Sequence, residues 1–278
     1  MFIKSYSKIN LALKVNYKSK NGLHEIQSFY CWINLFDKIK INKIKKKKDI
    51  INFIGPFAKF IKKKNNTVFK LLNKLRELNL ISSCYSIQVT KNIPVFAGLG
   101  GGTSNAAFIL NYLLKKKIKN SLLNKFEDII GTDLKLFSKK QGFLKDLKTI
   151  IDIKNKQTFY FVLMKPKITC STREIYSKVK KVSKKERFNK NLVNSRNEFL
   201  NYLSKSRNDL QYIVEREYPL IKKILTEIKN EKGCYFSRMT GSGSVCYGLF
   251  KDQNDAKKAL YNLKNKHPKF WLTLAKTV

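Results

Sequence analysis

A glycine-rich segment that runs straight into a helical pattern is the feature that most limits what this chain can fold into. Four of the twelve glycines fall within five positions, at Gly98, Gly100, Gly101 and Gly102. Glycines have no Cβ, so several backbone N–H groups can converge on one anion. The positive end of a following helix adds to that attraction. The segment predicts a phosphate-binding loop; the alternative is a tight strand-to-helix turn without a ligand.

Three common nucleotide-binding loops do not fit this segment. A Walker A loop requires a lysine after the last glycine, but Thr103 follows Gly102 here. A dinucleotide-binding loop requires a third glycine at the position of Thr103. The chain also contains neither the His-Arg-Asp nor the Asp-Phe-Gly triplet of protein kinases. The phosphate loop therefore belongs to another class.

The hydrophobic pattern predicts strands and helices in both halves of the chain. Alternating or continuous apolar runs predict strands over residues 5–15, 25–43, 84–90, 159–164, 245–250 and 271–277. Helical spacing predicts helices over residues 66–80, 122–130, 171–180, 198–203, 210–215, 218–230 and 254–263, and one directly after the glycines with Thr103 or Ser104 as its N-cap. Residues 18–22 read as a turn, and residues 234–244 as a turn before a strand. A polar stretch over residues 152–158 predicts a domain boundary.

The net charge of +39 is the most unusual number in the composition. It results from 51 lysines and only 7 arginines against 19 acidic residues, whereas recognition of phosphates and bases commonly favours the bidentate arginine fork. Lysine, Asn, Ile, Phe and Tyr are all abundant and all have A- and T-rich codons. Genomic base composition, steering of anionic small substrates and nucleic-acid binding are the three explanations.

Cysteines and apolar runs indicate the compartment. The five cysteines are scattered and form no Cys-x-x-Cys pair, which argues against a disulfide framework or a structural zinc site. No apolar run reaches the length of a membrane helix, and the N-terminus lacks the apolar core of a signal peptide. We expect a cytoplasmic protein with reduced thiols.

Six short motifs carry a resemblance to a known family. Residues 94–104 resemble the phosphate loop of the GHMP kinase superfamily. Residues 7–11, 22–27 and 131–133 are similar to segments of the branch of that superfamily that phosphorylates a cytidine diphosphate-linked methylerythritol. Thr240 to Ser244 resembles the third motif of the superfamily, and the segment around Asn208 resembles a short Asn-Asp-Leu motif of the branch. The motifs occur in the family's order and span nearly the whole chain.

The resemblance implies an α+β fold of two domains. Residues 1–155 would form an ATP-binding domain like domain 2 of ribosomal protein S5, and residues 156–278 a ferredoxin-like domain. The implied reaction is transfer of phosphate from ATP to the 2-hydroxyl of 4-diphosphocytidyl-2-C-methyl-D-erythritol, which gives the 2-phosphate and ADP in the non-mevalonate isoprenoid pathway. ATP and Mg²⁺ are the implied cofactors. We expect a small-molecule substrate, no membrane or nucleic-acid partner, and a monomer or weak homodimer.

The resemblance also implies roles for individual residues. Asp133 would orient the acceptor hydroxyl and accept its proton, and Lys8 would pair with Asp133 and contact the transferred phosphate. The implied ATP-binding residues are Pro94, Gly98, Leu99, Gly100, Gly101, Gly102, Thr103 and Ser104. The implied substrate-binding residues are Asn10, His24, Thr172, Tyr176, Gly241, Ser242 and Gly243. No protein ligand for Mg²⁺ is implied, although Ser104 is a candidate.

Two departures from the family pattern affect these expectations. Leu23 stands where relatives have a tyrosine, so an aromatic surface for the cytosine is missing there. After Asp133 the chain reads Leu134-Lys135-Leu136-Phe137 instead of Val-Pro-Phe-Phe. Loss of the proline predicts a looser turn and weakened, but retained, activity.

Two other functions stay open at this point. One is another small-molecule kinase of the superfamily, such as a homoserine or mevalonate kinase, which residues 22–27 argue against. The other is a nucleic-acid-binding protein on an S5-like scaffold, which would show strongly salt-dependent binding.

Overall fold

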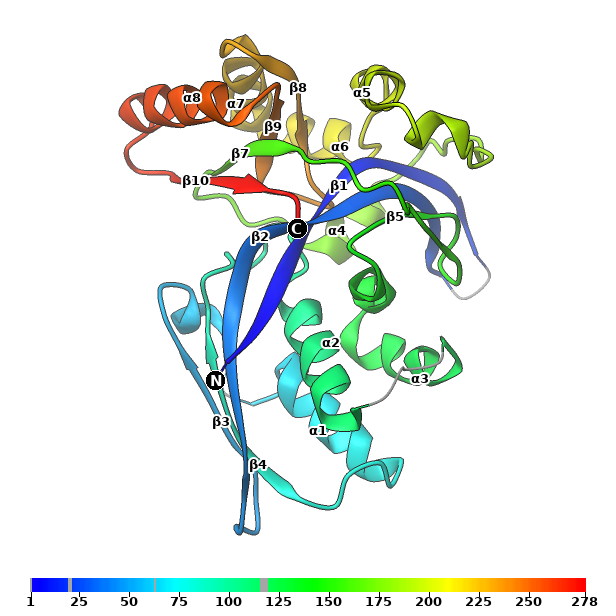
Figure 1. Ribbon diagram of the computed structural model, residues 1–278, viewed down its shortest axis with the longest axis vertical. Helices are drawn as coiled ribbons and strands as arrows, with labels where there is room; N and C mark the ends of the chain where they lie inside the picture. Colours follow the sequence, from blue (N-terminus) through cyan, green and yellow to red (C-terminus); the bar gives the residue numbers. More distant parts are fainter. Residues whose placement is uncertain (1, 20–21, 63, 116–119) are drawn as a thin grey trace. The chain divides into compact units, whose positions relative to one another are not determined.

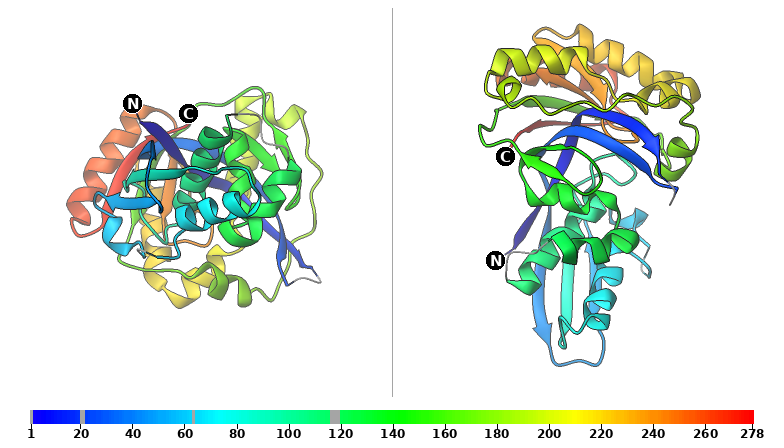
Figure 2. Two further views of the ribbon diagram at one scale, coloured as in Figure 1. Left: turned by 90° about the horizontal axis from the view of Figure 1, so that it is seen from below. Right: turned by 90° about the vertical axis from the view of Figure 1, so that its right-hand side faces the viewer.

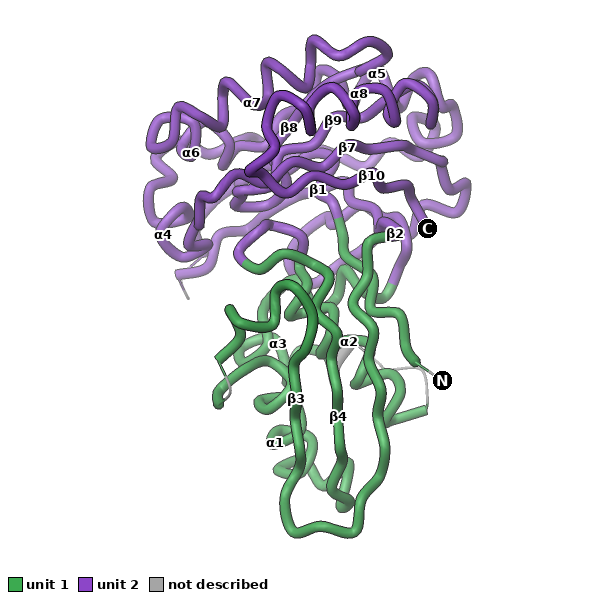
Figure 3. Tube along the Cα trace, turned by 90° about the vertical axis from the view of Figure 1, so that its left-hand side faces the viewer, with its two compact units in different colours: residues 1–8, 35–95, 100–138 green, residues 9–34, 96–99, 139–278 purple. Residues whose placement is uncertain are grey.

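The computed structural model describes residues 2–19, 22–62, 64–115 and 120–278. Their contacts divide the chain into two compact units, which are described separately (Figure 3). Unit 1 comprises residues 1–8, 35–95 and 100–138, and unit 2 comprises residues 9–34, 96–99 and 139–278. The turn predicted over residues 18–22 includes residues 20 and 21, which lie outside the described residues.

The two long N-terminal strands contribute residues to both units. In chain order, unit 1 takes part of β1 (Ile3–Lys18) and of β2 (His24–Ile44), then β3 (Ile50–Ile54), η1 (Ala58–Phe60), α1 (Thr67–Glu77), β4 (Cys84–Thr90), α2 (Gly101–Leu114), α3 (Asn120–Ile130) and η2 (Thr132–Ser138). Residues 38–44 of β2 pair antiparallel with β4, whereas residues 28–31 pair with β5 in unit 2. The units therefore interleave along the chain, and the division at residues 155 and 156 stays a prediction.

The sheet of unit 1 is built around β4. This strand pairs antiparallel with β2 and parallel with β3. Parallel neighbours need a crossover connection, which α1 supplies between β3 and β4. Val68, Leu71, Leu72 and Leu75 give α1 one buried face, and α1 packs against α2 and α3 (Figure 1). This packing fixes the helix α2 that begins at the glycine-rich segment.

Unit 2 contains a four-stranded antiparallel sheet covered by two helices. Its further elements are β5 (Gln141–Leu144), β6 (Ile150–Asp152), β7 (Tyr160–Lys165), α4 (Thr172–Ser177), η3 (Asn191–Val193), α5 (Arg196–Lys205), α6 (Gln211–Glu217), α7 (Pro219–Asn230), β8 (Cys234–Met239), β9 (Cys246–Phe250), α8 (Gln253–Lys266) and β10 (Trp271–Lys276). The strand order is β10–β7–β9–β8, the order of a ferredoxin-like β-α-β-β-α-β unit. Helices α7 and α8 pack on this sheet (Figure 2).

The structure corrects several expectations about elements. Helix α2 begins at Gly101 with Gly100 as its N-cap, so Thr103 and Ser104 lie inside the helix and neither is the cap. Strands β3, β5, β6 and β8 were not predicted, because each is short or lies beside a turn-rich sequence. The remaining predicted strands and helices are present, with ends that differ by a few residues.

Candidate active site

The first turn of α2 presents an open helix N-terminus in unit 1. Its N-cap, Gly100, has the left-handed φ of 70°, and no side chain caps the helix. The first N–H groups of a helix have no acceptor within it, and here they belong to Gly101, Gly102 and Thr103. Ser104 N donates to Gly100 O at 2.8 Å and closes the turn. This part of the predicted phosphate loop has the geometry of an anion cradle.

Glycine is required at position 100 by its neighbours as well as by its φ. A Cβ there would lie 3.3 Å from Lys8 Cε and 3.0 Å from Phe137 Cζ. The bare backbone thus lets the lysine of β1 and a ring of η2 approach the beginning of α2. Lys8 is buried, and its Nζ lies 3.3 Å from Asp133 Oδ2. The structure brings the two predicted catalytic residues together beside the cradle.

Asp133 is the accessible partner of this pair. Its side chain is 34% exposed, whereas that of Lys8 is 3% exposed. Asp133 follows Gly131, whose φ of 125° turns the chain out of α3, and it lies in the first turn of η2. A carboxylate held by a buried amine and open to solvent is suited to accept a proton from a bound hydroxyl.

Several contacts anchor the turn after Asp133. Lys135 is buried, and its Nζ lies 2.7 Å from Glu127 Oε1 on α3. Ser138 Oγ donates to Lys135 O at 2.7 Å, and Leu134 and Phe137 are buried. An ion pair and apolar anchors hold the segment that a proline stiffens in relatives. The sequence did not reveal the partner of Lys135, and the effect of the missing proline stays a prediction.

A buried polar cluster lies directly beneath the cradle, and sequence reasoning missed it. Asp37, Lys91 and Asn105 are each at most 1% exposed and contact one another. One signal was available: alternation along β2 places Asp37 on the same strand face as the buried Ile33 and Ile39. Nothing distinguished Lys91 among 51 lysines.

Ser104 faces the protein rather than a ligand. It is fully buried, donates to Tyr6 O at 2.6 Å and lies 2.7 Å from Ser5 Oγ. Its N–H already bonds Gly100 O. Ser104 thus anchors α2 to β1, and its role in nucleotide or metal binding stays a prediction. Of the other loop residues, Pro94 and Leu99 are buried, and Gly102 O accepts from Thr67 Oγ1 at 3.0 Å.

In unit 2, the second glycine segment, residues 240–244, packs against Gly98. A Cβ on Gly98 would lie 2.0 Å from Thr240 O, and one on Gly241 would lie 3.1 Å from Gly98 Cα. Thr240 Oγ1 donates to Gly98 O at 3.3 Å and accepts from Asn10 N at 3.0 Å. The predicted residues Gly98, Gly241 and Asn10 therefore meet at this turn.

Neutral side chains hold the remainder of the turn. The amide of Asn208 donates to Met239 O and Gly241 O, each at 2.8 Å. The hydroxyls of Ser242 and Thr172 lie 2.9 Å apart, so the beginning of α4 meets the turn. Gly243 has a φ of 87°, and a Cβ there would lie 2.7 Å from Met239 Sδ. These contacts place Thr172, Ser242 and Gly243 together.

The rings of two predicted substrate-binding residues, His24 and Tyr176, contact each other. The centroids of His24 and Tyr176 are 5.4 Å apart with the planes tilted by 33°, a direct aromatic contact. A base enters between them only if the rings separate; it can also stack on an outer face. Burial, followed by the charge of Lys18, lowers the pKa of His24. The neighbouring Leu23 is exposed.

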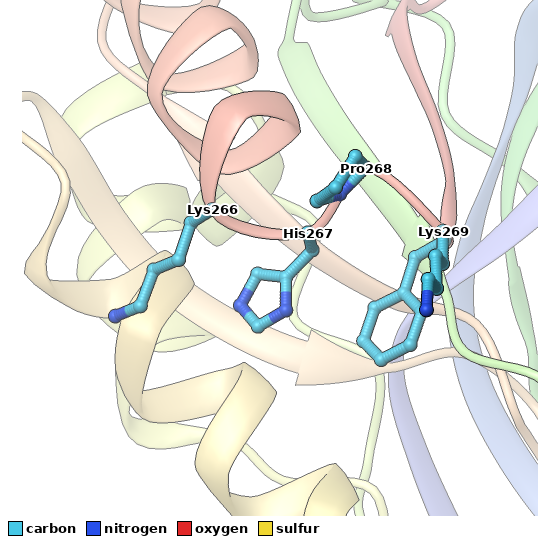
Figure 4. Close-up of a pocket in the computed structure, with 5 residues that line it drawn as sticks. Lys266, His267, Pro268 and Lys269 are labelled. Carbon is cyan, nitrogen blue, oxygen red and sulfur yellow. The ribbon is translucent and has the colours of Figure 1, made fainter.

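A shallow hollow of about 260 Å³ lies elsewhere in unit 2, at the turn between α8 and β10 (Figure 4). It is lined by residues 266–270 and contains none of the predicted site residues. His267 there stacks on Phe270 and contacts Glu227 Oε2 at 2.5 Å. The side chain of His267 is 14% exposed.

Comparisons with known proteins agree with this architecture. Residues 66–131 match the family described as GHMP kinases N terminal domain, and residues 188–269 match GHMP kinases C terminal. A crystal structure of 4-(cytidine 5'-diphospho)-2C-methyl-D-erythritol kinase matches with a TM-score of 0.75 and 20% identity over 99% of both chains. A homoserine kinase structure from Cytophaga hutchinsonii matches with a TM-score of 0.64 and 16% identity, over 98% of this chain and 94% of that one. The fold is the two-domain α+β fold of GHMP kinases, as predicted.

Curated sequences narrow the class. The 4-diphosphocytidyl-2-C-methyl-D-erythritol kinase of Pelagibacter ubique is 39% identical over 99% of this chain and 98% of its own. The kinase of the same name from Clostridium botulinum is 33% identical over 98% of this chain and 99% of its own. The chain belongs to the family of 4-diphosphocytidyl-2-C-methyl-D-erythritol kinases. None of its described helices is long and apolar enough to span a membrane.

Proposed function

We propose that this chain transfers the γ-phosphate of ATP to the 2-hydroxyl of 4-diphosphocytidyl-2-C-methyl-D-erythritol, giving the 2-phosphate and ADP. The family supports the reaction and the substrate. The observation that carries the mechanism is the pair of Lys8 and Asp133, 3.3 Å apart next to the uncapped N-terminus of α2.

The proposed roles follow from the requirements of phosphoryl transfer, which are positioning and stabilisation of charge. The N–H groups of Gly101, Gly102 and Thr103 bind ATP phosphates. Lys8 contacts the transferred phosphate, and Asp133 orients the hydroxyl and accepts its proton. The acceptor oxygen bonds to the γ-phosphorus as the bond from that phosphorus to the β,γ-bridging oxygen breaks, ADP leaves with the electron pair, and the proton of the hydroxyl goes to the Asp133 carboxylate.

Mg²⁺ belongs to the proposal as the companion of ATP. It neutralises phosphate charge when bound, and it commonly takes its protein ligands from only one or two carboxylates, with phosphates and water completing the shell. Ser104, the candidate from the sequence, does not fit that role, because its side chain is fully buried and its hydroxyl donates to Tyr6 O within unit 1.

The other residues predicted to bind the acceptor lie in unit 2. We propose that His24, Tyr176 and Thr172 recognise its cytidine end, and that Asn10 and the turn of Gly241, Ser242 and Gly243 contact the remainder. The contact of His24 with Tyr176 supports a shared aromatic surface. The same proposal includes a nucleotide-binding N-terminal domain over residues 1–155, a second domain over residues 156–278, a cytoplasmic location, and a monomer or weak homodimer.

The test is ADP release from ATP and 4-diphosphocytidyl-2-C-methyl-D-erythritol by native protein and by Asp133→Asn. Loss of a positioned base costs about 10²- to 10⁴-fold in kcat. Asp128→Asn, an exposed position on the neighbouring α3, is the matched control and should turn over like native protein. Homoserine and mevalonate are assayed in parallel; turnover of either one in preference to the cytidylated substrate would refute the substrate assignment.

A further inference from the structure

The buried cluster beneath the phosphate cradle ties together the two chain segments that flank it. Asp37 Oδ1 accepts from Asn92 N at 2.7 Å and from Ile93 N at 2.9 Å. These residues precede the glycine-rich segment. Asp37 Oδ2 accepts from Asn105 Nδ2 at 2.9 Å, and Asn105 lies in α2, after the glycines.

Lys91 closes the cluster. Its Nζ donates to Asn105 Oδ1 at 3.0 Å and also to Asp37 Oδ2. Lys91 is 1% exposed and Asp37 is 0% exposed. Burial lowers the pKa of Lys91, although the Asp37 carboxylate acts in the opposite direction. An ion pair so deeply buried stabilises a structure only when its remaining donors and acceptors are satisfied, and here both carboxylate oxygens have two donors.

The cluster extends to Ser104 and lies against the cradle itself. Asn105 Nδ2 also donates to Ser5 Oγ at 3.0 Å, which lies 2.7 Å from Ser104 Oγ. A Cβ on Gly101 would lie 3.5 Å from Lys91 Nζ and 2.9 Å from Ile93 Cγ2. The cradle backbone therefore rests directly on the cluster, with no side chain of its own between them.

We propose that Asp37, Lys91 and Asn105 are positioning residues for ATP, which hold the N–H groups of Gly101–Thr103 in the orientation that binds its phosphates. The inference rests on the proposed function and deepens it. The cluster touches no substrate atom; it acts by fixing the backbone before and after the cradle. Small misplacements of preorganised donors are costly, because a displaced donor no longer points at the phosphate oxygen.

Asn105→Ala tests the inference, since it removes the link between Asp37, Lys91 and α2 but leaves the charge pair. Asn111→Ala, on an exposed position of the same helix, is the matched control. We expect the KM for ATP and the Kd for ADP to rise about tenfold, with the KM for the acceptor unchanged. Asn111→Ala should change none of these constants.

Ser5→Ala is the second variant, in case Asn105→Ala does not fold. It removes only the hydroxyl between Asn105 and Ser104, and we expect a smaller rise in the KM for ATP, about twofold, again without change for the acceptor. A merely structural cluster would instead lower kcat and melting temperature together and leave the KM for ATP unchanged, which would overturn the inference while native turnover upholds the proposed function. Native protein that binds no ADP would overturn both.

Discussion

Around the phosphate cradle of unit 1, three lysines lie with at most 3% of the side chain exposed, and each pairs with a carboxylate: Lys8 with Asp133, Lys91 with Asp37, and Lys135 with Glu127. Around the glycine turn of unit 2, neutral groups make the contacts. Asn208 donates to two carbonyls, and Thr240 bonds Asn10 and Gly98. The two glycine segments thus share a composition but not a scaffold.

The difference has an energetic consequence. Removing one partner of a buried ion pair leaves an uncompensated charge, whereas changing both partners together can be almost neutral. Removing one member of a neutral network costs only the groups that it satisfied. In unit 1, a single substitution in an ion pair should therefore lower the free energy of unfolding strongly, and substitution of both partners should restore most of it. In unit 2, the loss of stability should be in proportion to the hydrogen bonds or the space lost.

The largest effect is expected for Lys91→Met, which leaves the buried Asp37 carboxylate without its counter-charge. We expect a loss of about 3–5 kcal/mol in the free energy of unfolding, measured in urea. The double variant Lys91→Met with Asp37→Asn should recover most of it, and Lys40→Met on an exposed position of β2 should change little. A loss below about 1 kcal/mol for Lys91→Met would show that the buried ion pairs of unit 1 are no more sensitive to substitution than the neutral contacts of unit 2.

Gly98→Ala comes next and tests steric fit in unit 2. The new Cβ would meet Thr240 O at 2.0 Å, on a residue with a φ of 70°. We expect about 3 kcal/mol of destabilisation from overpacking and backbone strain together. Gly22 has a φ of 82° but nothing within 4 Å, so Gly22→Ala should cost only about 1 kcal/mol. Equal losses of unfolding free energy for Gly98→Ala and Gly22→Ala, measured in urea, would show that the close contact with Thr240 does not affect stability.

Asn208→Ala measures the neutral scaffold itself. Two buried carbonyls, Met239 O and Gly241 O, lose their donor, and we expect about 2 kcal/mol of destabilisation. The comparison is Asn201→Ala, on an exposed position of α5, which should lie within about 0.5 kcal/mol of native protein. A loss for Asn208→Ala as large as that for Lys91→Met would erase the proposed difference in response.

Glu127→Gln probes the charged scaffold near Asp133, the proposed catalytic carboxylate. Lys135 would keep its buried position without a charged partner, at a cost of about 1–3 kcal/mol. Because Lys135 lies two residues after Asp133, we expect kcat to fall several-fold with both KM values unchanged. The surface pair of Glu77 and Lys74 provides the control, and Glu77→Gln should leave kcat and stability as they are. Unchanged kcat in Glu127→Gln would remove the link between this pair and Asp133.

The smallest effect is a pH dependence of stability in unit 2, which comes from the predicted site residue His24. Its pKa is lowered from 6.5 in the folded protein by burial and Lys18. Below pH 6.5 the unfolded chain binds a proton that the folded protein does not, so stability should fall as the pH drops from 6.5 through the folded pKa. The urea midpoint should decrease less between the upper and the lower end of this pH window in His24→Asn than in native protein. An equal decrease in both proteins would show that protonation of His24 is not linked to folding.

Much of the fold was readable from local pattern. The glycine segment and the helix after it, the amphipathic α1 and the strand β4 each follow from spacing within a few residues. The N-cap of α2 was misplaced because Gly100 takes a left-handed conformation that favours glycine, while Thr103 and Ser104 have the more familiar capping side chains.

The candidate site was readable only where motif order gave weight to a residue. Lys8 and Asp133 were paired in this way, and the structure places them 3.3 Å apart. Lys135 could be seen only as a departure from a family pattern, because its partner Glu127 lies on a preceding helix whose orientation the sequence does not give.

The sequence by itself determined the class of protein and the position of the glycine-rich segment, since these depend on residue type and on the spacing within short motifs. Only the tertiary structure decided what holds that segment. Asp37, Lys91 and Asn105 are far apart in the chain and ordinary in type, and they acquire a role because folding buries them together. Water no longer solvates the charges there, so each must find its partner within the protein.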